Sequence, residues 1–136
     1  MRLVIDTNVI VAALLTPGRT PDRALAVALA RGDTLLHDAR IVEEYRDVLA
    51  RPKFRRVDPA RTAALLASLL AHGEDLGVVA PWVGALIDAD DRAFVEVALA
   101  GRADAVVTGN TRHYPTDLAF AVLSPTELLA RFEAPY

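Results

Sequence analysis

Short apolar runs that alternate with longer alanine- and leucine-rich segments constrain the fold of this chain more than any other feature. The short runs are mostly continuous stretches of Leu, Val, Ile and Ala, without the polar and apolar alternation of a strand that has one wet face. Strands of this kind are typical of a parallel sheet covered by helices on both faces. The pattern therefore predicts an α/β fold, a three-layer α/β/α sandwich with a central parallel five-stranded sheet.

The predicted elements alternate along the whole chain. Strands are expected at residues 2–5, 34–37, 76–80, 105–108 and 119–123. Helices are expected at residues 21–31, 39–50, 59–72, 90–101 and 125–132, where apolar positions recur at helical spacing. Ser124 is the expected cap of the last helix, with Pro125 at its first position. Because open parallel sheets bind ligands beyond the carboxyl ends of their strands, polar residues at those ends are the candidate functional residues.

Length and composition indicate one domain spanning residues 1–136. A chain of 136 residues can bury one sizeable core, and 53% hydrophobic residues with a mean hydropathy of +0.27 argue against disorder. The chain has no cysteine, which excludes thiol catalysis, thiolate metal ligation and a disulfide framework. No apolar run reaches the roughly 18 residues of a membrane span, and no signal peptide is indicated. We therefore expect a cytoplasmic protein without a membrane span.

The charge of the chain does not identify its partner. The net charge is −3 at pH 7, yet one dense basic stretch follows the helix expected at 39–50. Its members are Arg51, Lys53, Arg55 and Arg56. Two interpretations stay open: the basic side chains complement the negative end of the helix macrodipole, or they form a patch that contacts the phosphates of a nucleic acid.

Asp6 is the first candidate site residue. It follows the first expected strand, and with Thr7 and Asn8 it forms a polar triplet between two apolar runs. A carboxylate in such surroundings has to be paired, hydrogen-bonded or bound to a metal ion. The simpler alternative is that Asp6 or Thr7 caps a helix that begins here.

Two further acids lie on the inner sides of expected helices. At about 100° per residue, Glu44 borders the apolar face of its helix, whereas Glu43 and Asp47 lie opposite. Asp91 shares the apolar face of the helix that it begins, whereas Glu96 points away. The alternatives are a boundary residue that extends to solvent for Glu44, and simple dipole complementarity at a helix start for Asp91.

The turn after the fourth expected strand supplies the last candidates. Thr108 and Asn110 lie at the carboxyl end of that strand, and Gly109 between them permits a tight turn. Their side-chain oxygens can bind a cation or orient a water molecule, although an ordinary capped turn explains them equally well. His113 is a candidate phosphate contact near the same turn.

Asp6, Glu44, Asp91 and the turn at 108–110 are distant in sequence but are expected to converge at one end of the sheet. Hard oxygen ligands, without cysteine and without a paired histidine motif, favour Mg²⁺ or Mn²⁺. Such an ion lowers the pKa of a bound water molecule and stabilises the charge that develops on a phosphodiester during hydrolysis. The residues therefore favour metal-dependent hydrolysis of a phosphate ester.

The same residues in the same order resemble the PIN-domain nucleases. The likeness runs from residues 4–9 through Glu44 and Asp91 to residues 107–110, and so covers essentially the whole chain. Residues 49–54 and 108–115 resemble one branch of that family, the toxin components of bacterial toxin–antitoxin pairs.

This resemblance implies a ribonuclease that binds Mg²⁺ or Mn²⁺ through Asp6, Glu44 and Asp91, with Thr108 in support. The fourth acidic position of the family is Asn110 here, whose amide oxygen can still coordinate an ion but carries no charge. The change favours one-metal chemistry or reduced activity. The resemblance also implies an RNA substrate, a cognate antitoxin protein and a homodimer.

Three functions from different classes stay open. A metal-dependent endoribonuclease would combine the acidic site with RNA contacts from the basic stretch and His113. A catalytically weak PIN-fold protein would bind RNA or an antitoxin, because Asn110 lacks a charge that Asp117 would have to supply. An α/β phosphatase-type hydrolase would use Asp6 as a nucleophile, but that chemistry expects a second aspartate where this chain has Asn8.

Overall fold

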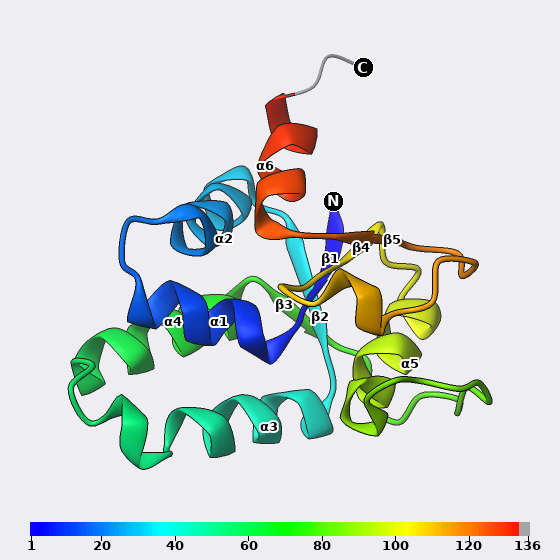
Figure 1. Cartoon of the computed structure of the whole chain (residues 1–136), viewed down its shortest axis with the longest axis horizontal. Helices are drawn as coiled ribbons and strands as arrows, with labels where there is room; N and C mark the ends of the chain where they lie inside the picture. The colour runs from blue at the N-terminus through cyan, green and yellow to red at the C-terminus, as the bar shows by residue number, and fades with distance from the viewer. Residues whose placement is uncertain (134–136) are drawn as a thin grey trace.

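The computed structural model describes residues 1–133 and contains a fully parallel sheet flanked by helices (Figure 1). The sheet has five strands in the order β3-β2-β1-β4-β5. The strands are β1 (Arg2–Ile5), β2 (Thr34–His37), β3 (Gly73–Asp75), β4 (Ala105–Val107) and β5 (Ala121–Leu123). The α-helices are α1 (Thr7–Leu15), α2 (Thr20–Arg31), α3 (Ala39–Leu49), α4 (Pro59–Ala71), α5 (Arg92–Ala100) and α6 (Pro125–Glu133), and the 3-10 helices are η1 (Pro52–Phe54), η2 (Ala89–Asp91) and η3 (Thr111–His113). The predicted three-layer α/β/α sandwich is confirmed.

The sheet changes its direction of growth at β1. The chain first adds β2 and β3 on one side of β1, and then crosses through α5 to add β4 and β5 on the other side. Leu3 of β1 is in register with Leu35 of β2 and Ala105 of β4. The carboxyl ends of β1 and β4 therefore lie side by side at a topological switch point, where open parallel sheets bind ligands. The residues that follow these two strands are Asp6 and Thr108.

The core lies between the sheet and the helices that pack on it. All three residues of β4 and the inner residues of β1 are buried. Helix α5 packs on β1, β2 and β4, whereas α1 packs on α2 and α3, and α2 contacts α6. Tight apolar packing of this kind fixes the strand ends, because well-packed interiors do not deform continuously. Within residues 1–133, no helix has both the length and the apolar character needed to cross a membrane.

The predicted strands are confirmed except for the third. The strands expected at 2–5 and 34–37 agree with β1 and β2, and those expected at 105–108 and 119–123 contain β4 and β5. The strand expected at 76–80 is wrong, because β3 lies just before it and residues 76–88 form no strand. As an edge strand with exposed side chains at Glu74 and Asp75, β3 needs no apolar run, so its sequence carries no strand signal.

The predicted helices agree with α2 to α6 to within two residues at each end. Ser124 caps α6 as expected: its hydroxyl accepts from the backbone N–H of Glu127, whose side chain accepts in turn from the backbone N–H of Ser124. Helix α1 is absent from the predicted set. Its residues from Val9 onward are all apolar, so no helical period is visible, and tertiary burial rather than amphipathic pattern explains the helix.

Leu3 offers a test of how strongly the central strand holds the fold. Leu3 is 0% exposed, whereas Leu15 at the end of α1 is 48% exposed. We expect Leu3→Ala to lower the free energy of unfolding by about 2 to 5 kcal/mol, because it leaves a cavity in a packed core. Leu15→Ala removes the same atoms and should change it by less than about 1 kcal/mol. Equal losses in urea unfolding of the two variants would contradict this assignment of the core.

Candidate active site

Asp6 leaves the end of β1 with its carboxylate in the protein interior, and the residue is 6% exposed. Thr108 and Tyr114 each donate a hydroxyl hydrogen bond to Oδ2 of Asp6, at 2.9 and 3.0 Å. Burial raises the pKa of Asp6, and these two hydrogen bonds oppose the rise. Although Asp6 occupies the N-cap position of α1, its side chain makes no capping hydrogen bond. The backbone N–H groups of Asn8 and Thr7 also favour the ionised form of Asp6, so the start of α1 supports this acid but does not account for its two hydroxyl partners.

Thr108 and Asn8 form a hydrogen-bonded frame beside Asp6. The Oγ1 atom of Thr108 accepts from the backbone N–H of Asn110 at 3.0 Å and from the side-chain amide of Asn8 at 3.3 Å. The side-chain oxygen of Asn8 accepts from the backbone N–H of Gly109 at 2.9 Å. A Cβ atom at Gly109 would lie 3.4 Å from that oxygen, an ordinary van der Waals contact, so the turn does not depend on glycine. The frame joins the ends of β1 and β4 and fixes the position of Asp6.

Glu44 reaches the same end of the sheet from α3. It is half-buried, and the hydroxyl of Thr7 donates a hydrogen bond to one of its carboxylate oxygens. Its neighbours Glu43 and Asp47 are exposed, as the helical spacing predicted. Burial raises the pKa of Glu44, and the negative charge of Asp6 raises it further. Glu44 is therefore close enough to the other acids to sense their charge.

Asp91 lies at the start of α5 and is 8% exposed. It makes no capping hydrogen bond with its side chain, whereas Asp88 caps η2 by accepting from the backbone N–H of Asp90. The ligand atoms of Asp88, Asp91 and His113 all lie within 4.8 Å of one another, the one such group among residues 1–133. Asp6 and Glu44 do not join that group at this spacing. Asp88, which the sequence did not single out, thus lies beside Asp91 together with His113.

The acids at this end of the sheet are not neutralised by basic side chains. Within the described chain, Asp6, Glu44, Asp88 and Asp91 have no lysine or arginine nitrogen within 4.0 Å, and the Nδ1 atom of His113 lies 3.9 Å from Asp91. Burial raises the pKa of Asp91 to about 6, and the charges of Asp6 and Asp88 contribute to the rise. Bound protons or a cation would relieve this repulsion. The carboxylate oxygens are hard ligands that suit a divalent cation such as Mg²⁺ or Mn²⁺.

Two other residues that the sequence suggested, Asn110 and Asp117, lie at the surface. Asn110 is exposed, and with Asn8 and Gly109 it lines a cavity of about 280 Å³ between α1, α2 and the start of α6. Asp117 is exposed in the segment between η3 and β5. Asp117 does not belong to the group of possible metal ligands found among residues 1–133.

The predicted basic stretch lies on the surface, but not beside the acids. Its four basic residues are exposed in and around η1, which follows α3 at the end of the helix remote from α5 (Figure 1). The acidic residues instead come from the end of β1, from the middle of α3 and from the start of α5. A ligand that contacts both regions has to extend along α3. The members of the stretch are Arg51, Lys53, Arg55 and Arg56.

Tyr114, like Asp88, is a site residue that the sequence did not single out. Its side chain is buried and contacts Asp6, from which it is separated by 108 positions in the chain. Burial raises the pKa of Tyr114 strongly, and the charges of Asp6 and Asp91 add to the rise, so the hydroxyl keeps its proton near neutral pH. A tyrosine in a loop carries no local signal of such a contact, because the signal exists only in the folded chain.

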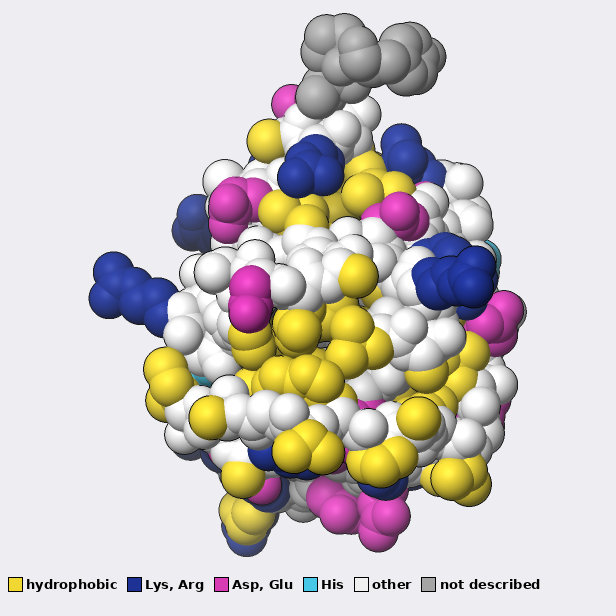
Figure 2. Space-filling model, turned by 90° about the vertical axis from the view of Figure 1, so that its right-hand side faces the viewer, with side chains coloured by type: hydrophobic (Ala, Val, Ile, Leu, Met, Phe, Trp, Pro, Cys, Tyr) yellow, Lys and Arg dark blue, Asp and Glu magenta, His cyan; other side chains and the backbone are white. Residues whose placement is uncertain are grey.

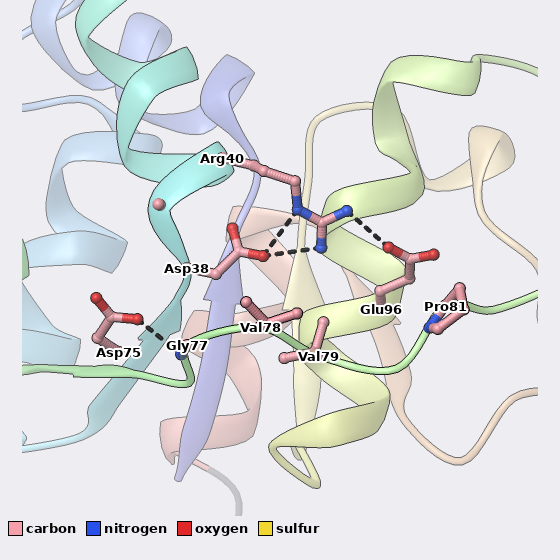
Figure 3. A pocket seen from close by; sticks show the side chains of 9 residues that line it. Asp38, Arg40, Asp75, Gly77, Val78, Val79, Pro81 and Glu96 are labelled. Carbon is pink, nitrogen blue, oxygen red and sulfur yellow. Dashed lines mark hydrogen bonds and ion pairs between the residues drawn. The ribbon is translucent and has the colours of Figure 1, made fainter.

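An ion-pair clamp joins α3 to α5 next to the site (Figure 3). Arg40 of α3 pairs with Asp38 at 2.8 Å and with Glu96 of α5 at 2.7 Å. Glu96, which was expected to point away from the acidic face, is 5% exposed and also accepts from the backbone N–H of Trp82 at 2.9 Å. Burial raises the pKa of Glu96, but its hydrogen bonds more than offset this and leave the pKa below its usual value.

The segment at residues 76–88 is held by its backbone on α5. Arg92 donates hydrogen bonds to the carbonyl oxygens of Trp82 and Gly84, at 2.7 and 2.8 Å. Residues 76–87 carry no charged side chain, and Val78 and Val83 are almost fully exposed. Hydrophobic side chains gather on the face of the molecule that includes this side of α5 (Figure 2). The segment thus combines a fixed path with exposed apolar side chains.

A family model described as PIN domain matches residues 2–112, which is most of the chain. The chain belongs to the PIN-domain family. The match includes Asp6, Glu44, Asp91 and Thr108, so the acidic residues at the strand ends lie within the family region. It ends just before His113 and Tyr114, the two loop residues that contact Asp91 and Asp6.

A solved structure supports the same PIN-domain fold. The chain matches one in the crystal structure of VapBC2 from Rickettsia felis bound to a DNA fragment from their promoter. The sequence identity is 16%, the match covers 91% of this chain and 98% of that chain, and the TM-score is 0.61. At this identity the likeness concerns the fold. No curated protein matches the chain at a significant level.

The raised pKa of Asp91, about 6, predicts that this residue destabilises the metal-free fold at neutral pH. Below about pH 4 the carboxyl is protonated in both the folded and the unfolded chain and has no effect. Between about pH 4 and 6 the unfolded chain releases the proton first, so stability falls, and above pH 6 the full cost applies. Asp91→Asn should therefore raise the free energy of unfolding at pH 7.5 in EDTA by about 1 to 3 kcal/mol.

Urea unfolding in EDTA at pH 4.5 and at pH 7.5 measures this effect. The gain from Asp91→Asn should shrink strongly at pH 4.5, where the wild-type carboxyl is already mostly protonated in the folded chain. Asp117→Asn, at an exposed acid, is the matched control and should leave stability nearly unchanged at both pH values. An Asp91→Asn variant less stable than wild type at pH 7.5 would contradict the repulsion argument.

Proposed function

We propose that this PIN-domain protein is a divalent-metal-dependent endoribonuclease. The observation that carries the proposal is the set of acids near the end of β1. Burial and their mutual repulsion raise the pKa of Asp91 and Glu44, and among residues 1–133 no lysine or arginine nitrogen lies within 4.0 Å of them. A set of carboxylates held together in this way favours a bound cation. Membership of the PIN-domain family supports nuclease chemistry for that cation.

The donor set fits Mg²⁺ or Mn²⁺, with Asp6, Glu44 and Asp91 as the proposed ligands. Asn110 is an outer ligand or a water-orienting residue, and Asp88 and His113 complete the surroundings of Asp91. When bound, such an ion supplies a water molecule of lowered pKa and stabilises negative charge on the phosphodiester.

Uncharged side chains hold the acids in place for this chemistry. Thr108 donates to Asp6, and the frame made with Asn8 fixes Thr108 in turn. Thr7 donates to Glu44 in the same manner. Because hydroxyl and amide donors orient a carboxylate without cancelling its charge, the acids keep their full attraction for a cation.

RNA is the proposed substrate, and it would extend from the acidic site along α3 to the basic stretch. The exposed residues of that stretch can contact phosphates without reading the sequence. His113, close to Asp91, is the proposed contact nearest the bond that breaks. The proposed contacts in the basic stretch are Arg51, Lys53, Arg55 and Arg56.

We further propose that the protein is the toxin of a cytoplasmic toxin–antitoxin pair, blocked by a cognate antitoxin and active as a homodimer. The structural match to a chain of VapBC2 from Rickettsia felis, which was crystallised with a DNA fragment from their promoter, supports this proposal at the level of the fold.

One observation favours a second candidate function. Asn110 stands where the resemblance implies a fourth acid, and Asp117 is exposed elsewhere in the loop. With one negative charge fewer, the site would bind a second ion weakly. A PIN-fold protein of this kind would bind RNA or an antitoxin and turn over slowly or not at all.

RNA cleavage by the purified protein tests the enzyme directly. Structured and unstructured RNA would be incubated with it in Mg²⁺, in Mn²⁺ and in EDTA. We expect cleavage in either metal and none in EDTA. Asp6→Asn should reduce the rate at least about 100-fold, because it removes a charged ligand from the ion.

Two controls separate the candidate functions. Glu43→Gln removes an exposed acid next to Glu44 and should leave the rate unchanged, which excludes a nonspecific effect of charge. RNA binding measured in EDTA distinguishes a binding protein from an inert one. If wild type and Asp6→Asn cleave alike, the activity is a contaminant, and metal-independent RNA binding would then favour the second candidate.

A further inference from the structure

We infer that Tyr114 is a positioning residue for the cation site. Its hydroxyl and that of Thr108 together occupy Oδ2 of Asp6, and this arrangement leaves Oδ1 to bind the ion. The inference rests on the metal-binding role proposed above for Asp6. It adds a residue beyond the region that matches the family model, which ends at residue 112.

Both hydroxyl hydrogen bonds end on the same carboxylate oxygen. Tyr114 donates to Oδ2 at 3.0 Å and Thr108 donates to it at 2.9 Å. An ionised carboxylate has about four acceptor positions, two on each oxygen, so two donors satisfy Oδ2. They also prevent rotation of the carboxylate, because either donor alone would permit a swing around its own hydrogen bond. The orientation of Asp6 is therefore set from two sides, by β4 and by the loop after η3.

Tyr114 is itself well anchored. The residue is 4% exposed, and its backbone N–H donates to the carbonyl oxygen of Thr111 at 3.3 Å. The preceding residue, His113, lies 3.9 Å from Asp91. Two consecutive residues of one loop thus contact the acid at the end of β1 and the acid at the start of α5. This segment therefore orients Asp6 directly, through Tyr114, and places the His113 ring near Asp91.

Tyr45 provides a matched comparison within the same chain. It is also buried, at 5% exposure, and its hydroxyl donates to the backbone carbonyl oxygen of Ile5, the residue before Asp6. Its hydrogen bond therefore supports the strand end but does not touch the carboxylate. Tyr45→Phe and Tyr114→Phe each remove the hydroxyl oxygen of a buried tyrosine. Only the hydroxyl of Tyr114 contacts the carboxylate of Asp6.

Calorimetric titration with Mn²⁺ alone, without RNA, tests the inference. We expect Tyr114→Phe to weaken Mn²⁺ binding about 10-fold, the lower part of the range for residues that orient a metal ligand, because Thr108 still donates. The Mn²⁺ concentration for half-maximal RNA cleavage should rise by the same factor, with kcat restored at saturating Mn²⁺ and KM for RNA unchanged. Tyr45→Phe should lower thermal stability and leave Mn²⁺ affinity as in wild type.

The outcomes separate this inference from the proposed function. Wild type that binds Mn²⁺ and cleaves RNA, with Tyr114→Phe binding Mn²⁺ equally well, would overturn the role of Tyr114 and leave the nuclease proposal intact. Equal losses of affinity in Tyr114→Phe and Tyr45→Phe would reduce Tyr114 to a general structural residue. Wild type that binds no Mn²⁺ would overturn both proposals.

A measurement on the unsubstituted chain covers the case in which Tyr114→Phe does not fold. The chain has three tyrosines, so labelling with 3-fluorotyrosine gives a simple fluorine NMR spectrum. Tyr45→Phe and Tyr136→Phe variants assign the signals. Addition of Mg²⁺ should shift the signal of Tyr114, which bonds directly to Asp6, by more than that of Tyr45, which bonds to the backbone of Ile5. A Tyr114 signal that does not respond to saturating Mg²⁺ would contradict the inference.

Discussion

Repulsion among the carboxylates of Asp6, Glu44 and Asp91, which come from the end of β1, from α3 and from the start of α5, is the constraint to which the surrounding structure is fitted. The parallel sheet and α5 hold the backbone of Asp6 and Asp91 in place, so the acids cannot move far apart. The side chains that contact Asp6 and Glu44 are hydroxyls, which stabilise an anion through hydrogen bonds while leaving its charge intact. Basic residues are used for another task nearby, since Arg40 pairs with Glu96 between α3 and α5. The site thus keeps its negative charge, while an ion pair joins α3 to α5.

Most of the fold could be predicted from the sequence, because the strands of a parallel sheet buried on both faces are continuous apolar runs. The prediction fails where the apolar pattern of the sequence does not correspond to an element of the sheet or its helices. Edge strand β3 has exposed side chains and needs no apolar run, whereas the apolar residues at 76–80 form no strand. Helix α1 is apolar along most of its length, so a continuous run concealed its period. Both errors arise from tertiary context, which no window of neighbouring residues contains.

The residues of the candidate site also divide into those that the sequence predicts and those that it does not. Asp6, Glu44 and Asp91 could be singled out because a strand end and a helical period say which way a side chain faces, and all three lie at least partly buried at one end of the sheet. Whether they bind a common ion stays a prediction. His113 was singled out only as a phosphate contact, and Asp88 only as part of a helix start. Tyr114 reaches Asp6 across 108 positions, and such a contact has no local signature. Glu96 was placed on the correct helix, but its burial depends on Arg40, a residue 56 positions away.

The hydrogen bonds from α5 to residues 82–84 also affect how the exposed apolar segment at residues 76–88 can change during evolution. Arg92 and Glu96 hold residues 82–84 through peptide N–H and carbonyl groups, which every residue except proline provides in full. Substitutions of the side chains at Val78, Val83 or Ile87, all exposed, therefore leave the path of the segment unaltered. The acidic start of α5 and the exposed side chains of the neighbouring segment are consequently independent of each other. The exposed side chains of this segment can therefore change one residue at a time without moving Asp91, which lies directly before the same helix.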